Sequence, residues 1–171
     1  SEKQVPGRQR LYFYVRACKP KNFMGWMMDI YDYIQECDGK PFKWGVFDCC
    51  HFAGGAIAVL CGHNPMGSVP AYDDETTASI ALRERFGTTS VREAFLIIAE
   101  EMGATRVENN DLKDGDILTI DFGKFARHRC QVDQSAGMGL YFNNSIYVCL
   151  QPRGLARLGN MTTLIDAWRF V

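Results

Sequence analysis

The stretch from Phe42 to Gly62 constrains the fold of this chain most, because it places a cysteine at the first turn of a tightly packed helix. A turn rich in aromatic residues leads to Asp48, a residue type that caps helices well, and Cys49 follows it. The apolar face of the predicted helix consists of Cys49, Phe52, Ala53, Ala56 and Leu60. Its small side chains permit close packing, and Gly62 is typical of a helix end. We therefore predict a buried helix that begins near Asp48.

Three further helices are predicted from apolar residues at helical spacing. They run from Trp26 to Cys37, from Thr76 to Phe86, and from the capping box Ser90-Val91-Arg92-Glu93 to Gly103. Short β-rich runs occupy 11–15, 116–122, 139–142, 146–150 and 166–171, and Asn143-Asn144 joins two of them as a hairpin. Because helices come first and antiparallel strands second, the order predicts an α+β fold with N-terminal helices packed on a C-terminal antiparallel sheet.

The domain organisation follows from the same reading. Residues 1–10 are polar and contain Pro6 and Gly7, so we predict an N-terminal arm that docks on a partner. Residues 11–171 are predicted to form a single domain. The basic loop from Lys124 to Arg129 is polar and lacks an apolar face, and we expect it to make intermolecular contacts as well.

Composition narrows the classes of function. The chain has 171 residues, 47% of them hydrophobic, and a net charge of -1, so no global field draws it to nucleic acid or to an anionic membrane. It contains no apolar run long enough to span a bilayer and no signal-peptide core at its start, and we expect synthesis in a cytoplasm without membrane insertion. The seven cysteines are scattered without a CxxC pair, and we expect no disulfide framework, metal or cofactor.

Cys49 is the candidate nucleophile. A thiol at a helix N-terminus meets the positive end of the helix dipole and unpaired amides, which favour the thiolate. The negative charge of Asp48 next to it opposes that effect. The alternative is that Cys49 only fills space, as most buried cysteines do. Cys50 leaves open which thiol faces a cleft, and helical spacing gives Cys50 the more outward position.

The segment from Phe42 to Cys49 resembles the aromatic-Trp-Gly…Asp-Cys signature of the NlpC-type peptidoglycan cysteine peptidases, and more closely a phage tail-associated branch of that superfamily. The residues that carry the resemblance are Trp26, Pro41, Phe42, Trp44, Gly45, Asp48, Cys49, Gly62, Pro65, Ala167, Trp168 and Arg169. Asp114-Gly115-Asp116 and residues 137–141 are similar to the sheet motifs of the superfamily. The resemblance covers residues 26–171 and implies a papain-like fold with Cys49 as nucleophile.

The resemblance also implies a histidine where this chain has Gly137, which cannot take a proton. His51 lies two residues after Cys49 and is expected to point to another side of the helix, and His63 is expected in a solvated loop. His128 is the remaining candidate base. Trp44 is the best candidate to line a substrate cleft beside Asp48, although aromatic side chains also serve as core.

Three functions remain. The first, which we prefer, is a structural component of a phage tail tip, baseplate or hub, made in the bacterial host cytoplasm and carried in the virion tail, with a degenerate peptidase fold. The second is an active peptidoglycan endopeptidase that cuts cell-wall peptide stems during genome entry with Cys49 and His128, or with a base supplied by a partner. A weaker third is a papain-like acyltransferase or deamidase. The partners implied are other tail-tip or hub proteins and peptidoglycan.

Overall fold

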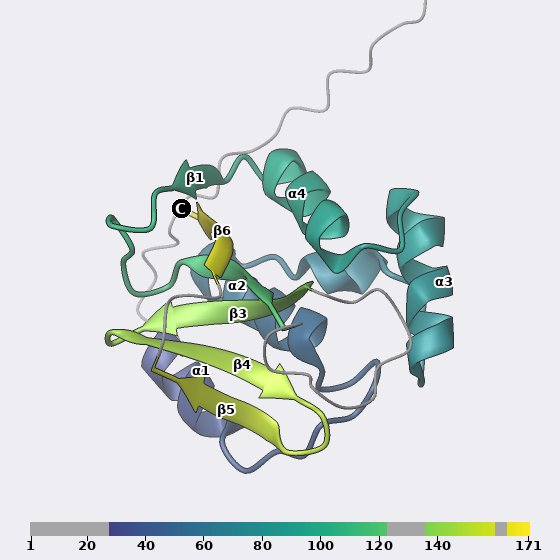
Figure 1. The fold of residues 1–171 in the computed structure, drawn as a ribbon, viewed down its shortest axis with the longest axis horizontal. Coiled ribbons are helices and arrows are strands. Elements are labelled where there is room, and N and C mark those ends of the chain that lie inside the picture. The colour runs from purple at the N-terminus through teal and green to yellow at the C-terminus, as the bar shows by residue number, and fades with distance from the viewer. Residues whose placement is uncertain (1–27, 123–135, 160–163) are drawn as a thin grey trace, which may run out of the picture.

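The structure is a computed structural model that describes residues 28–122, 136–159 and 164–171. The predicted arm 1–10, the predicted strand 11–15, Trp26 and the loop 124–129 with His128 lie outside the described residues. Within the described residues the helices precede the strands in an α+β order (Figure 1). The elements are α1 (Ile30–Cys37), α2 (Cys49–Cys61), η1 (Pro65–Ser68), α3 (Glu75–Phe86), α4 (Val91–Glu101), β1 (Thr105–Val107), β2 (Ile117–Asp121), β3 (Ala136–Phe142), β4 (Ser145–Leu150), β5 (Gly154–Leu158) and β6 (Leu164–Arg169).

The strands form one sheet of order β1-β6-β2-β3-β4-β5 in which every neighbouring pair is antiparallel. This confirms the predicted α+β class and the antiparallel sheet. The predicted hairpin joins β3 to β4, with Asn143 and Asn144 at φ 48° and 53°, as a two-residue hairpin turn requires. The sequence reading missed β1, which has only three residues, and β5, which begins at a glycine.

Helix α2 is bounded as predicted, by Asp48 at its N-cap and by Gly62, which ends it at φ 74°. The predicted capping box of α4 is only half formed. Ser90 accepts the Glu93 amide, but the Glu93 carboxylate accepts a hydrogen bond from the Thr88 hydroxyl instead of reaching back to the N-cap. The Thr88 hydroxyl therefore replaces the N-cap amide as the partner of the Glu93 carboxylate. The capping-box motif alone does not predict this partner.

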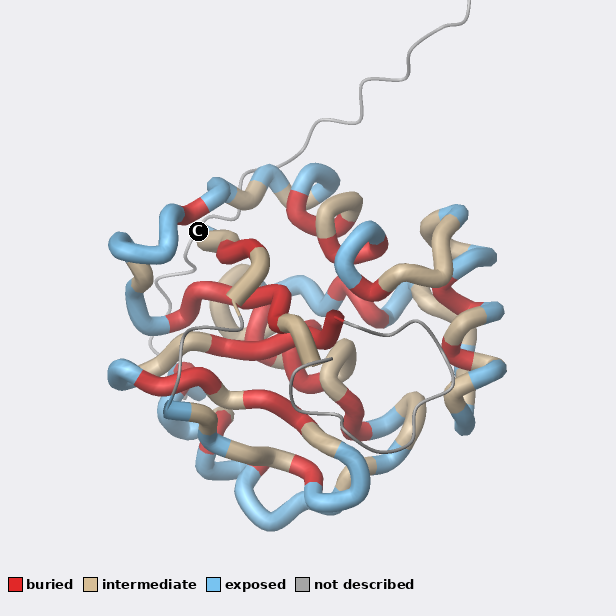
Figure 2. The backbone as a smooth tube through the Cα atoms, in the orientation of Figure 1, coloured by how far each residue is buried: buried red, intermediate tan, exposed pale blue. Residues whose placement is uncertain are grey.

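Helix α2 packs on one face of the sheet, as predicted. Phe52 and Ala56 are fully buried, and they share a core with Met138 and Leu140 of β3. The other face holds a second core that consists of Val107, Leu118, Ile120, Ile146, Val148 and Ala167. Buried residues accordingly run through the central strands and α2 (Figure 2). Adjacent residues of β3 thus face different cores, and this alternation decides what lies beside Cys49.

Two motifs that are distant in the sequence but lie on neighbouring strands meet in an ion pair. The Arg169 guanidinium donates from Nε to Asp116 Oδ1 at 2.9 Å and from Nη2 to Oδ2 at 2.8 Å. Asp116 is 1% exposed and also accepts the Lys113 amide. This two-pronged contact ties the start of β2 to the end of β6.

Replacing Ala56 with Phe is expected to lower the free energy of unfolding by roughly 1–3 kcal/mol, because the fully buried site cannot take a larger side chain. Ile80→Phe on α3, where the side chain is 59% exposed, is the control and is expected to stay within about 0.5 kcal/mol. Urea denaturation measures both, and an unchanged midpoint for Ala56→Phe would show that α2 is not buried.

Arg169→Ala is expected to cost roughly 2–4 kcal/mol, since it leaves the buried Asp116 carboxylate without its charged partner. The matched control is Arg85→Ala, whose partner Glu101 is 48% exposed, and its cost is expected to be about 0–1 kcal/mol. Equal costs for the two variants in chemical denaturation would contradict a structural role for the Asp116 pair.

Candidate active site

A tight turn leads into the candidate site. Lys43 and Phe47 exchange backbone hydrogen bonds of 2.9 and 2.8 Å, which close the turn that carries Trp44, Gly45 and Val46. Gly45 has φ +69°, and a Cβ on it would lie 1.8 Å from the carbonyl oxygen of Tyr72. The position therefore requires glycine, both for its backbone conformation and for the close approach of the Tyr72 segment.

Asp48 is buried where this turn meets α2, and only 1% of it is exposed. Its Oδ1 accepts the His51 amide at 2.9 Å, and its Oδ2 accepts the Gly45 amide at 2.9 Å and the Tyr72 hydroxyl at 2.8 Å. Burial raises the pKa of Asp48, but hydrogen bonds from His51 and Tyr72 outweigh burial and hold this pKa below its usual range. Asp48 is therefore a buried carboxylate that accepts its hydrogen bonds from groups of the protein itself.

The imidazole of His51 belongs to the same cluster. His51 Nδ1 lies 3.1 Å from Asp48 Oδ1, 3.2 Å from Asp48 Oδ2 and 3.1 Å from the Tyr72 hydroxyl oxygen. Because the single phenolic proton goes to Asp48, the pattern assigns a proton to Nδ1 in the neutral ring. In the described part of the chain, no hydrogen bond joins an imidazole to the Cys49 sulfur. His51 is thus directed to Asp48 and Tyr72, in agreement with the expectation that it points away from Cys49.

Cys49 is half-buried at the first turn of α2, with its sulfur 4.0 Å from the Cys50 sulfur. A hydrogen bond from the Cys50 thiol lowers the pKa of Cys49, and backbone amides of Met138 and Cys50 act in the same direction. Burial and the Asp48 charge oppose them, but the pKa of Cys49 remains below the ordinary thiol value. The hydrogen bond with Cys49, together with burial, raises the pKa of Cys50 well above the ordinary thiol value. The site thus favours a thiolate on Cys49.

The strand position at which the resemblance implies a histidine faces away from this site. Met138 of β3 shares the core of α2, whereas a Cβ on its neighbour Gly137 would lie 1.8 Å from a ring carbon of Phe122. Phe122 packs against the core on the other face of the sheet. Gly137 is therefore a packing glycine, and an imidazole there would need Phe122 to move. On the side of β3 that faces α2, Cys49 meets Met138.

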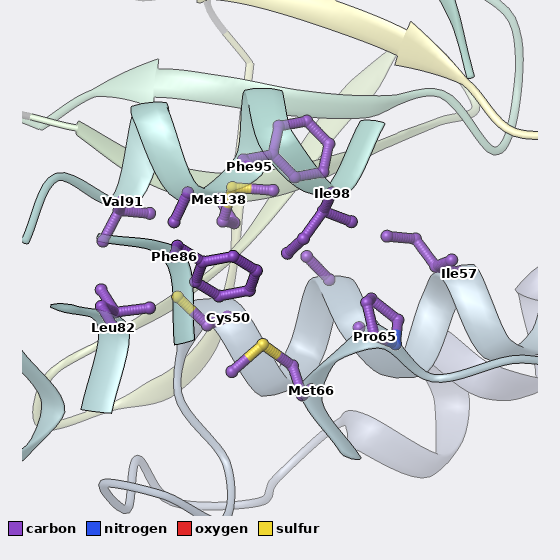
Figure 3. Close-up of a pocket in the computed structure, with 13 residues that line it drawn as sticks. Cys50, Ile57, Pro65, Met66, Leu82, Phe86, Val91, Phe95, Ile98 and Met138 are labelled. Atoms are coloured by element: carbon purple, nitrogen blue, oxygen red, sulfur yellow. The ribbon is translucent and has the colours of Figure 1, made fainter. Parts of the chain in front are cut away.

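Cys50 lines a small cavity between α2, α3, α4 and β3, of about 20 Å³ (Figure 3). The side chains around it are apolar apart from the Cys50 thiol, and they include Met66, Phe86 and Met138. A volume near that of one water molecule cannot hold a peptide or a sugar. The expectation that Cys50 is the more outward thiol is not supported, since both cysteines are half-buried and Cys50 faces this cavity.

The remaining predicted site residues are placed as follows. Trp44 is half-buried and packs edge-on against Phe42 with ring centroids 5.0 Å apart, so it lies next to the site in the turn before Asp48. His63 is exposed after the end of α2, as predicted.

The described residues contain no group of three or more His, Cys, Asp or Glu side chains that could hold a metal ion. None of the described helices is long and apolar enough to cross a membrane.

The sequence reading missed Tyr72, which completes the Asp48 cluster from 24 residues away. It lies in a polar loop after Pro70, and nothing in the local sequence signals a partner for its hydroxyl. Burial in this cluster raises the pKa of Tyr72, so the phenol keeps the proton that it donates to Asp48.

Tyr72→Phe removes one donor from the buried Asp48 carboxylate and is expected to destabilise the protein by roughly 1.5–3 kcal/mol. Asp48 has a depressed pKa in the folded state, so its stabilisation is present above the unfolded value and is lost as pH falls through the folded value. With a weaker depression, Tyr72→Phe should unfold in acid at a higher pH than the wild type. Tyr31→Phe, at a site that is 54% exposed, is the control, and coinciding acid transitions would contradict this role of Tyr72.

Comparison with known proteins shows to which family the chain belongs. No curated protein matches the chain. A family model described as a domain of unknown function (DUF6950) matches residues 21–170, a range that contains every described helix and strand as well as the Asp48 cluster and Cys49. The chain belongs to this family, the domain of unknown function DUF6950.

Proposed function

We propose that this chain is a structural component of a bacteriophage tail tip, baseplate or hub that keeps a papain-like, NlpC-type peptidase fold and has lost catalysis. The sequence resemblance over residues 26–171 supports the phage tail assignment. The order of helices before an antiparallel sheet, with the cysteine-bearing helix α2 packed on β3, supports the papain-like fold. On this proposal the partners are neighbouring tail proteins, and the chain moves from the host cytoplasm into the virion tail.

The observation that carries the loss of catalysis is the set of groups around the Cys49 sulfur. Among the described residues they are the Cys50 thiol, the backbone amides of Met138 and Cys50, and the buried Asp48 charge. The nearest imidazole in sequence, that of His51, is occupied by Asp48 and Tyr72. Cleavage of an amide needs a proton donor for the leaving nitrogen, and such acid–base help typically contributes about 10²–10⁴-fold in rate. A thiolate alone does not provide it.

The lowered pKa of Cys49 favours the second candidate, an active peptidoglycan endopeptidase. In that case His128, which lies in sequence between β2 and β3, or a partner protein would supply the base. Trp44, next to the helix start, would then contact the substrate.

Hydrolysis of purified cell-wall sacculi separates the two candidates. The wild-type protein is expected to release no more free amine than Cys49→Ala does, because no hydrogen bond in the described site joins an imidazole to the Cys49 sulfur, and an imidazole is what would protonate the leaving nitrogen. Mass spectrometry of purified phage particles is expected to find the intact chain in the tail. Clear turnover that is abolished by Cys49→Ala would overturn the scaffold proposal, and His128→Ala would then identify the base.

A further inference from the structure

The cavity beside Cys50 is lined by three sulfur-bearing side chains. Cys50 of α2, Met66 of η1 and Met138 of β3 all line this space of about 20 Å³, and Figure 3 shows them among the residues around it. A cavity of this volume holds one occupant of about the size of a water molecule. Three separate elements of the fold thus bring sulfur to one small space.

Two contacts place the methionines next to the Cys50 turn of α2. Gly54 follows Cys50 by four residues and therefore lies on the same face of the helix. A Cβ on Gly54 would lie 2.7 Å from Met66 Cγ, so the Met66 side chain packs directly on this face. On the sheet side, the Met138 amide donates a hydrogen bond to the Cys49 sulfur, which lies 4.0 Å from the Cys50 sulfur.

The walls of the cavity offer soft ligands only. Among the described residues that line it, the side chains are apolar apart from the Cys50 thiol, and none carries a carboxylate, an imidazole or a hydroxyl. A buried water needs about two to four polar partners, which one thiol does not supply. Thiolate and thioether sulfur are the ligands that select monovalent copper, whereas magnesium and calcium prefer oxygen.

We propose that this cavity is a binding site for a copper(I) ion, with the Cys50 sulfur and the Met66 and Met138 thioethers as its ligands. The described residues contain no group of three His, Cys, Asp or Glu side chains for a metal ion, so methionine is the residue that completes this set. The flexible methionine side chains allow each sulfur to turn toward the ion. The inference goes beyond the proposed function and does not rest on it.

The charges balance when the ion binds. The Cys50 thiol releases its proton to solvent as the copper–sulfur bond forms, and copper keeps its oxidation state. One thiolate then neutralises the single positive charge of Cu⁺, which suits apolar surroundings. Cys49 is half-buried, and its sulfur lies 4.0 Å from that of Cys50, so Cys49 is placed to take up the ion first and pass it inward.

Competition with a chelator tests the site. The 171-residue chain is titrated without oxygen against Cu(I) held by bathocuproine disulfonate, with ascorbate as reductant. We expect the wild type to take one equivalent of copper from the chelator. Cys50→Ser, Met66→Leu and Met138→Leu are each expected to weaken Cu(I) binding by at least about tenfold, since each removes one ligand.

Two variants outside the cavity are the matched controls. Cys149→Ser replaces a buried thiol whose hydrogen bond to the Phe47 carbonyl a hydroxyl can keep, and Met102→Leu replaces a half-buried core methionine. Both should bind Cu(I) like the wild type, and thermal melting without copper verifies that each variant is folded. Copper should raise the melting temperature of the wild type but not that of Cys50→Ser, because the ion links α2, η1 and β3.

X-ray absorption at the copper edge identifies the ligands directly. Selenomethionine-substituted wild-type protein with one Cu(I) per chain is expected to show sulfur and selenium as the only neighbours of copper. The selenium signal should fall in Met66→Leu and in Met138→Leu. The wild-type spectrum decides the question even where a variant does not fold.

Several outcomes overturn the proposal. They are a copper shell with nitrogen or oxygen or without selenium, unchanged binding in the three cavity variants, an equal loss of binding in Cys149→Ser or Met102→Leu, and binding of Zn²⁺ at least as tight as that of Cu(I).

Discussion

The site and its surroundings depend on the hydrogen bonds that the Asp48 carboxylate accepts. It joins three segments that are separate in sequence, since it accepts the Gly45 amide from the turn, the His51 amide from α2 and the hydroxyl of Tyr72 from the loop after η1. A buried carboxylate is tolerated only when such donors replace the lost water. Once they are in place, the start of α2 is fixed against β3, and the Cys49 sulfur is held near the amide of Met138.

The same interaction limits the chemistry of the site. Asp48 engages His51, the imidazole nearest to Cys49 in sequence, and adds a negative charge that opposes ionisation of the thiol. The hydrogen bond from the Cys50 thiol, together with the backbone amides of Met138 and Cys50, still outweighs burial and that charge, so the pKa of Cys49 stays below the ordinary thiol value. A stabilised thiolate is less basic and needs acid assistance at the leaving group to cleave an amide. Among the described residues near Asp48, His51 and Tyr72 could assist, but both bind the Asp48 carboxylate instead.

Local signals in the sequence are enough to predict the boundaries of α2 and the β3–β4 hairpin. Asp48 and Gly62 bound α2 because an N-cap and a left-handed glycine act within one turn, and Asn143-Asn144 sets the β3–β4 hairpin for a similarly local reason. Which residues of β3 face α2 could not be predicted in this way. Which core Gly137 or Met138 faces depends on pairing with β2 and on the position of Phe122, both of which are tertiary. Tyr72 was missed because its partner Asp48 is distant in sequence.

The pH dependence of Cys49 alkylation tests most directly whether this thiol works without an imidazole partner. The folded wild-type protein is treated with iodoacetamide, and fragment-ion mass spectrometry separates modification of Cys49 from that of Cys50. The rate at Cys49 should follow a single ionisation below the ordinary thiol value of about 8.5 and fall toward zero on its acid side. A rate that stays high down to about pH 4–5, with a second ionisation above it, would reveal a thiolate–imidazolium pair and contradict the degenerate site.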